Sequence, residues 1–173
     1  MATLPPHGDK YDFYSANGVI DFAYFPNAIL SDIGIDGIDI PIRLQRGDAG
    51  FGAVHIVREH GRWLDLHKLD AVSMVWLKLQ GNGKIYTTEE DDKLKINLYL
   101  HPKALLVLRF IPKKEPFFTV VTTYLPDGGL DGDELGHYPG HGNNTTPTFT
   151  LPEPKKKPTV IVKKKRTFTK PTE

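Results

Sequence analysis

Residues 50–61 gather two histidines, an arginine and a glutamate, at His55, Arg58, Glu59 and His60. Because a histidine ring titrates near neutral pH, it can accept or release a proton during a reaction. Ionisable groups concentrated at the edge of an otherwise apolar pattern indicate a site of chemistry. The alternative interpretation is a surface helix that carries charges without a function.

Two helices are expected to position these residues. The first has a capping side chain at Asp48, ends at Gly61, and buries Ala53, Val54, Ile56 and Val57. The second covers residues 64–80, where apolar residues recur at helical spacing at Leu66, Leu69, Val72, Val75, Trp76 and Leu79.

In the first helix, His55, Arg58 and Glu59 share one face, because residues three and four positions apart are neighbours on a helix. His60 is five positions from His55 and falls outside that face. A site that uses both histidines therefore requires His60 to reach in from the last turn of the helix.

Strand-like runs follow the helices at residues 84–89, 94–100, 104–111 and 117–125. The connections between them are short, and short connections join antiparallel neighbours. A short edge strand is expected within residues 33–42, because a proline such as Pro41 is tolerated in an edge strand but not in a central one. The predicted fold is α+β: N-terminal helices packed on a four-stranded antiparallel meander sheet, with a disordered or extended C-terminal tail.

The length of 173 residues fits one domain with appendages, and the lack of cysteine excludes disulfides and thiolate metal sites. Without an apolar run long enough to cross a membrane or a secretory signal, the expected location is the cytoplasm. Residues 1–10 are expected to form a flexible lead and residues 11–126 the folded domain. Residues 127–150 are expected to form a linker rich in Gly, Asp and Thr, and residues 151–173 a basic tail rich in Pro and Lys.

The net charge of +1 is unevenly distributed. Residues 151–173 contain eight Lys or Arg and two Glu, whereas the rest of the chain has 14 basic and 19 acidic residues. This asymmetry indicates nucleic acid or another anionic surface as a partner of the tail, with a merely solubilising tail as the alternative. His137 and His141 are four positions apart, but no third ligand is evident nearby, so no metal or cofactor is expected.

The order of motifs carries a resemblance to a known family. Residues 50–56 read Gly-Phe-Gly-Ala-Val-His-Ile and are followed by His60-Gly61, a helix, and strands that end in residues 118–124. This order resembles the BECR superfamily, the barnase–EndoU–colicin–RelE-like nucleases, in particular the branch found in phage proteins and polymorphic bacterial toxins. The resemblance covers about residues 41–125. The chain departs from toxin domains in continuing for nearly fifty residues beyond the last strand.

The resemblance implies metal-independent RNA cleavage, in which the ribose 2′-hydroxyl attacks the adjacent phosphate and leaves a cyclic phosphate. One group must take the proton of the hydroxyl, and another must give a proton to the leaving oxygen. His55 is assigned as the general base or acid, and His60 as the second proton carrier. Arg58 and Arg109 are assigned to clamp phosphate, where extra negative charge develops during the reaction.

The last strand completes the predicted site. Alternation places Thr122 and Tyr124 on one face together with Val120, where the two would hold the scissile phosphate. Thr123 is the fallback if the register is opposite. The alternative for Arg109 is a salt bridge on the strand face, and the alternative for the threonines is ordinary strand propensity.

Three functions compete. The first is an endoribonuclease that acts as a toxin or phage-encoded effector in the cytoplasm of a host or target bacterial cell. Its substrate is RNA, and its expected further partner is an immunity or antitoxin protein or a phage virion component. The second is a non-catalytic nucleic-acid-binding module that uses the basic tail. The third is a structural phage protein with a BECR-like domain, and none of the three involves a membrane.

Overall fold

The computed structural model describes residues 8–36, 39–90, 93–101, 103–128, 132–140 and 149–150. The basic tail, His141 and all but the last three residues of the predicted lead lie outside these ranges. Within the described ranges, no helix combines the length and the apolar character needed to cross a membrane.

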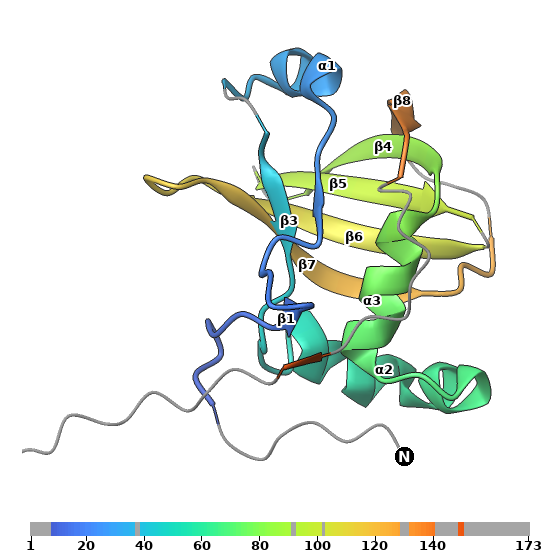
Figure 1. Cartoon of the computed structure of the whole chain (residues 1–173). Coiled ribbons are helices and arrows are strands. Elements are labelled where there is room, and N and C mark those ends of the chain that lie inside the picture. Colours follow the sequence, from blue (N-terminus) through green and yellow to red (C-terminus); the bar gives the residue numbers. More distant parts are fainter. Residues whose placement is uncertain are drawn as a thin grey trace, which may run out of the picture.

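A strongly curled mixed sheet forms the body of the described chain, with seven strands in the order β2-β3-β7-β6-β5-β4-β8 (Figure 1). Its strands are β2 Ala23–Tyr24, β3 Pro41–Arg43, β4 Gly83–Glu90, β5 Lys93–Leu100, β6 Ala104–Ile111, β7 Phe117–Tyr124 and β8 Asp133–Tyr138. A separate small sheet pairs β1 Ser15–Ala16 with β9 Phe149–Thr150. The helices are α1 Asn27–Leu30, the 3-10 helix η1 Ser31–Ile33, α2 Gly52–His67 and α3 Ala71–Gln80.

The predicted fold class is wrong, although its four strands exist close to the expected bounds. Strands β4 to β7 are antiparallel neighbours as expected, but the sheet extends beyond them on both sides. On one side β8, from the stretch predicted as a linker, pairs with β4. On the other side β3 pairs with β7 in parallel, with Ile42 opposite Phe118. Pairing between residues so far apart in sequence leaves no local signal, which is why a simple meander was expected.

Strand β3 is not the predicted edge strand, because β2 covers its other side. Pro41 is the first residue of β3. This is a position where a strand tolerates proline, since the missing N–H disturbs the ladder least there.

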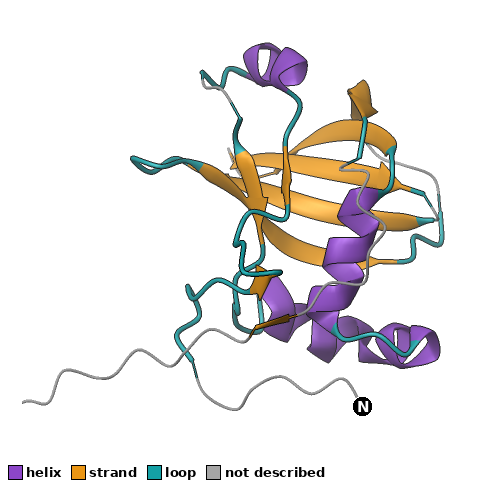
Figure 2. Cartoon of the chain, viewed as in Figure 1, coloured by secondary structure: helices purple, strands orange, loops and turns teal. Residues whose placement is uncertain are grey.

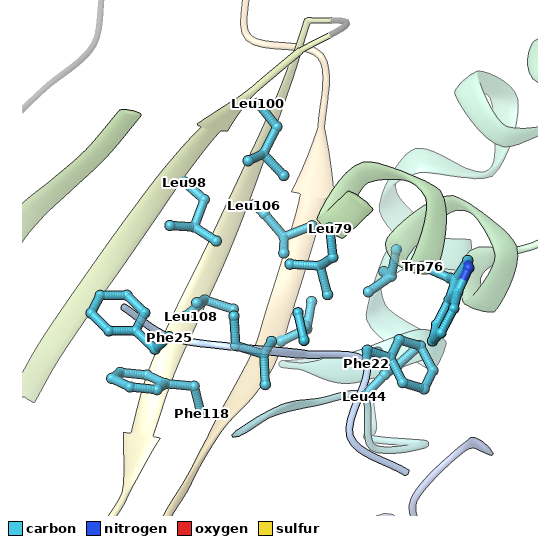
Figure 3. Close-up of a cluster of buried hydrophobic side chains, with 14 of the residues drawn as sticks. Phe22, Phe25, Leu44, Trp76, Leu79, Leu98, Leu100, Leu106, Leu108 and Phe118 are labelled. Atoms are coloured by element: carbon cyan, nitrogen blue, oxygen red, sulfur yellow. The ribbon is translucent and has the colours of Figure 1, made fainter. Parts of the chain in front are cut away.

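The hydrophobic core lies between α3 and one face of the sheet, which we call the inner face (Figures 2 and 3). Its sheet side comes from alternate residues of the central strands, namely Ile96, Leu98, Leu100, Leu106, Leu108, Phe118 and Val120. From α3, the predicted positions Val72, Val75, Trp76 and Leu79 are all buried. The ring of Phe22 meets Trp76 edge-on with centroids 5.5 Å apart, which joins the N-terminal segment to this core.

The helix predicted over residues 64–80 is divided between α2 and α3. Lys68 adopts the left-handed conformation (φ 54°) that ends α2, and Asp70 then caps α3. The Asp70 carboxylate accepts hydrogen bonds from the Ser73 backbone N–H at 2.8 Å and the Ser73 hydroxyl at 3.0 Å. Because of this break, Leu66 does not belong to the core stripe and its surface is 76% exposed.

Strand β7 contains an irregularity that changes the predicted alternation. Val107 of β6 lies opposite Thr122, but the next residue, Leu108, lies opposite Val120, so Val121 has no partner. The extra residue is a β-bulge, which shifts the alternation by one position. Thr122 therefore does not share a face with Val120, which points into the core.

The Asp70 cap can be tested by mutation. We expect Asp70→Ala to lower the free energy of unfolding by about 0.5–2 kcal/mol, because the backbone N–H and the hydroxyl of Ser73 lose their acceptor at the start of α3. Urea denaturation measures the change, and Asp127→Ala, which removes an exposed carboxylate outside any helix, is the control. Equal stability of Asp70→Ala and the control would contradict the capping role.

Candidate active site

The segment before α2 is held by backbone carbonyls, not by the expected Asp48 cap. Phe51 is the N-cap residue, and its side chain makes no capping bond. The first free N–H groups of the helix, from Ala53 and Val54, donate to the carbonyls of Gln45 and Arg46. Asp48 instead accepts from the Gly50 N–H at 2.9 Å and closes the turn before the helix.

His55 is oriented by the same turn. Its Nδ1 lies 2.7 Å from the carbonyl oxygen of Ala49. Since a carbonyl can only accept, Nδ1 must carry a proton and donate it. In the neutral ring, Nε2 therefore carries the free lone pair. Any proton that the ring gains or loses during a reaction binds to Nε2 or leaves from it.

The helix does not end at Gly61 as predicted, but bends there and continues to His67. The backbone of His60 leaves helical geometry (φ −127°, ψ 15°), and Gly61 follows directly. Sharp kinks in helices occur at such interruptions of the hydrogen-bond ladder. Residues five positions apart do not share a face of a straight helix, but the kink brings the two rings together. The ring centroids of His55 and His60 are 6.3 Å apart, with the ring planes at 84° to each other.

Tyr124 joins the two histidines from the end of β7. Its ring stacks on His60 with centroids 5.3 Å apart and an interplanar angle of 21°. Helix α2 packs along β7, so residues about sixty positions apart in sequence meet. His55, His60 and Tyr124 thus form one group of rings.

The environment of His60 lowers its pKa from the ordinary value of 6.5. Partial burial is the main cause, because it disfavours the charged ring, and the charge of His55 acts in the same direction. Glu59 opposes both effects. The lowered pKa favours the neutral form of the His60 ring at pH 7.

The two threonines of β7, Thr122 and Thr123, lie on opposite faces of the sheet. Because of the bulge, Thr122 shares the face of Tyr124 and Thr119, which we call the outer face, whereas Thr123 lies opposite Leu106 on the inner face. The Thr122 hydroxyl is buried and has no hydrogen-bond partner among the described residues. It lies beside the site but does not open onto it, so Tyr124 is the group of β7 that reaches the histidines.

Of the two predicted arginines, Arg58 lies on the same helix as the histidines, whereas Arg109 lies on β6 of the sheet. Arg58 is 66% exposed on α2, and its Nε lies 3.3 Å from a carboxylate oxygen of Glu59. Arg109 is exposed on the outer face, opposite Thr119. Four residues of strand separate it from Leu105, which lies opposite Tyr124, so it stands about 13 Å from the level of that ring.

The outer face contains polar residues that the predicted site omits. The registers arrange the residues of this face in three rows, in which Leu105 and Val107 are apolar and Arg109, Thr122 and Tyr124 belong to the predicted site. The rows are Lys84, Tyr99, Leu105 and Tyr124; Tyr86, Asn97, Val107 and Thr122; and Thr88, Lys95, Arg109, Thr119 and Arg43. Arg43 pairs with Asp21 at 2.5 Å, and Thr119 donates to Gln45 at 2.9 Å. Part of this face could be predicted from the sequence, since polar residues alternate with apolar ones through residues 95–99.

Two further features bear on ligands. A cavity of about 610 Å³ lies away from the histidines, lined by residues that include Ile33, Thr87, Leu94 and Leu135. Within the described ranges, no group of three or more His, Asp or Glu side chains is placed to hold a metal ion. Of His137 and His141, which the sequence places four positions apart, the described ranges contain only His137, which lies on β8.

Comparisons of the chain with protein-family models, with curated proteins and with solved structures give no match. The resemblance to the BECR nucleases therefore stays a prediction.

The coupling between the histidines leads to a titration test. We expect His55→Gln to raise the pKa of His60, because a neighbouring positive charge is lost, and Glu59→Gln to lower it further. Proton NMR of the imidazole signals across pH 4–9 measures both shifts. His67→Gln, at the exposed end of the same helix, should leave the His60 titration unchanged. Identical His60 curves in wild type and His55→Gln would show that the two rings do not interact.

Proposed function

We propose that the protein is a metal-independent endoribonuclease that cleaves RNA by attack of the ribose 2′-hydroxyl on the adjacent phosphate. The observation that carries this proposal is the oriented pair of histidines on the kinked helix. His55 has its Nδ1 proton committed to the Ala49 carbonyl, and His60 lies 6.3 Å away with a lowered pKa. The reaction requires two proton-transfer groups, one that accepts a proton and one that donates a proton.

The environments suggest a division of roles. His60, neutral at pH 7, accepts the proton of the 2′-hydroxyl as its oxygen bonds to phosphorus. His55 donates the proton on Nε2 to the departing 5′-oxygen as the phosphorus–oxygen bond breaks. After this step His60 is protonated and His55 is neutral. Hydrolysis of the cyclic phosphate, in which His55 accepts a proton from water and His60 donates one, restores the starting states.

Tyr124 and Arg58 are the nearest groups of suitable type for the phosphate. The Tyr124 ring stacks on His60, so its phenol belongs to the same group as the imidazoles. Arg58 lies between the histidines in sequence and is paired only with the adjacent Glu59 in the described contacts. A guanidinium and a phenol hydroxyl are both donors to the extra charge that develops on the phosphorane oxygens.

The outer face of the sheet supplies a surface for the rest of an RNA strand. It combines cationic side chains at Lys95 and Arg109 with the exposed or half-buried rings of Tyr99 and Tyr124. Positive charge along a surface that also offers aromatic rings is the usual arrangement for binding single-stranded nucleic acid. The toxin or effector role, and an immunity or virion partner, stay proposals attached to this activity.

The cleavage proposal has a direct test. The purified protein should cleave single-stranded RNA in the presence of EDTA and leave a 2′,3′-cyclic phosphate, detected by mass spectrometry. His55→Gln should lower kcat by roughly 10²- to 10⁴-fold, because a proton-transfer group is lost. His67→Gln is the matched control and should keep wild-type kcat. Full activity in His55→Gln would remove the histidine pair from the mechanism.

The contribution of the outer face can be measured separately. Arg109→Ala should weaken binding of single-stranded RNA and reduce the slope of log affinity against log salt concentration by roughly 0.7, the value for one phosphate contact. Binding is followed by fluorescence anisotropy at several salt concentrations. Lys114→Ala, in the exposed connection between β6 and β7, should keep the wild-type slope. An unchanged slope in Arg109→Ala would place the RNA on another surface.

A further inference from the structure

We infer that Tyr11 and Phe51 form a second binding subsite, which stacks a nucleobase of a single-stranded RNA next to the phosphate held by the histidines. The inference rests on the proposed function, since it names where a neighbouring nucleotide of the same substrate binds. No part of the predicted site included either residue.

The two rings form a pair at the surface. Their centroids are 6.3 Å apart and their planes are inclined at 31°. Tyr11 is 57% exposed, whereas Phe51 is half-buried beneath it. A single exposed aromatic residue needs no explanation. Here, however, the half-buried Phe51 ring backs the exposed Tyr11 ring and holds it in place at the surface.

A cation completes the subsite. The Lys10 ammonium lies 5.1 Å from the centre of the Tyr11 ring and 3.4 Å from the Asp48 carboxylate. The side chains of both partners are about half exposed. Lys10 is thus held over the ring by a solvent-facing ion pair. Such a pair is weak enough for a phosphate to compete for the ammonium and draw it off the ring, which leaves the ring to a base.

The subsite is rigidly connected to the histidines. Asp48 and Phe51 close one turn through the hydrogen bond from Asp48 N to Phe51 O, 3.0 Å long. Ala49, inside that turn, holds His55 at 2.7 Å. Phe51 is the N-cap residue of α2, four positions before His55 in the chain. The pair of Tyr11 and Phe51 thus lies at the start of α2, and the group of His55, His60 and Tyr124 follows it.

The ligand class follows from the chemistry of these groups. A ring pair offers stacking to any nucleobase, and the adjacent ammonium offers a contact to the phosphate of the same nucleotide. The Gln45 side-chain amide donates to the backbone carbonyl of Tyr11, and the Asp48 carboxylate pairs with Lys10, so the subsite recognises a base by stacking and not by its edge. A single strand is required, because a paired base is already stacked within a duplex.

The test uses a short fluorescein-labelled single-stranded oligodeoxynucleotide, which lacks the attacking 2′-hydroxyl and stays intact. Tyr11→Ala should raise its Kd by about 5- to 150-fold, the range that corresponds to the loss of one stacked base. Tyr11→Phe keeps the ring and should bind like wild type. Tyr24→Ala, which removes another exposed tyrosine on β2, is the matched control and should also bind like wild type.

The Tyr11→Ala change should not disturb folding. The backbone N–H of Tyr11 donates to Asp9 and its carbonyl accepts from Gln45, and both bonds survive truncation of the ring. In RNA cleavage, Tyr11→Ala should raise KM and leave kcat unchanged, because Tyr11 does not take part in proton transfer.

The outcomes separate the subsite from the nuclease. If RNA is cleaved in a His55-dependent manner but Tyr11→Ala has wild-type Kd and KM, the subsite is overturned and the nuclease stands. If the oligonucleotide binds through Tyr11 but RNA is not cleaved, the nuclease is overturned and the subsite stands. A wild-type protein that neither binds nor cleaves overturns both.

Discussion

The departure of the α2 backbone from helical geometry at His60 determines how the candidate site is assembled. A straight helix would turn His60 away from His55, because a spacing of five residues does not repeat on one helical face. The kink instead brings His60 between His55 and Tyr124, and the first half of α2 stays packed on the sheet through Ala53 and Ile56. A Cβ added at Gly61 would meet no atom within 4 Å, so the bend does not depend on a glycine at that position.

The second constraint is the bulge in β7. Without it, regular alternation would place Thr122 and Tyr124 on the same face as Val120, in the hydrophobic core. The unpaired Val121 lets the first half of the strand bury Phe118 and Val120, while the last residues present Tyr124 to the histidines. Bulges occur next to functional sites for this reason, since they re-aim a side chain without disrupting the sheet. Both local irregularities act on the same small group of rings.

Much of the architecture can be predicted from sequence, and the misses have identifiable causes. The four central strands and the buried face of α3 follow from periodicity, which is a local property of the chain. The parallel pairing of β3 with β7, and the addition of β8 to β4, depend on contacts between distant segments and leave no periodic signal. The residue types of the site were identifiable at His55, His60 and Tyr124. Their convergence was not, because the kink at His60 and the bulge at Val121 are single-residue departures from the regular geometry that the prediction assumed.

The parallel pairing of β3 with β7 also bears on when the ring group comes into existence. Helices α2 and α3 and strands β4 to β6 all lie in the chain between these two partners. Closing so long a loop costs entropy that local contacts cannot offset, so this pairing is among the slower steps of folding. Tyr124, at the end of β7, can meet His60 only after that strand has been synthesised and docked. A nascent chain on the ribosome therefore carries His55 and His60 without the residue that completes their group, and any activity that needs all three begins only after the domain has left the exit tunnel.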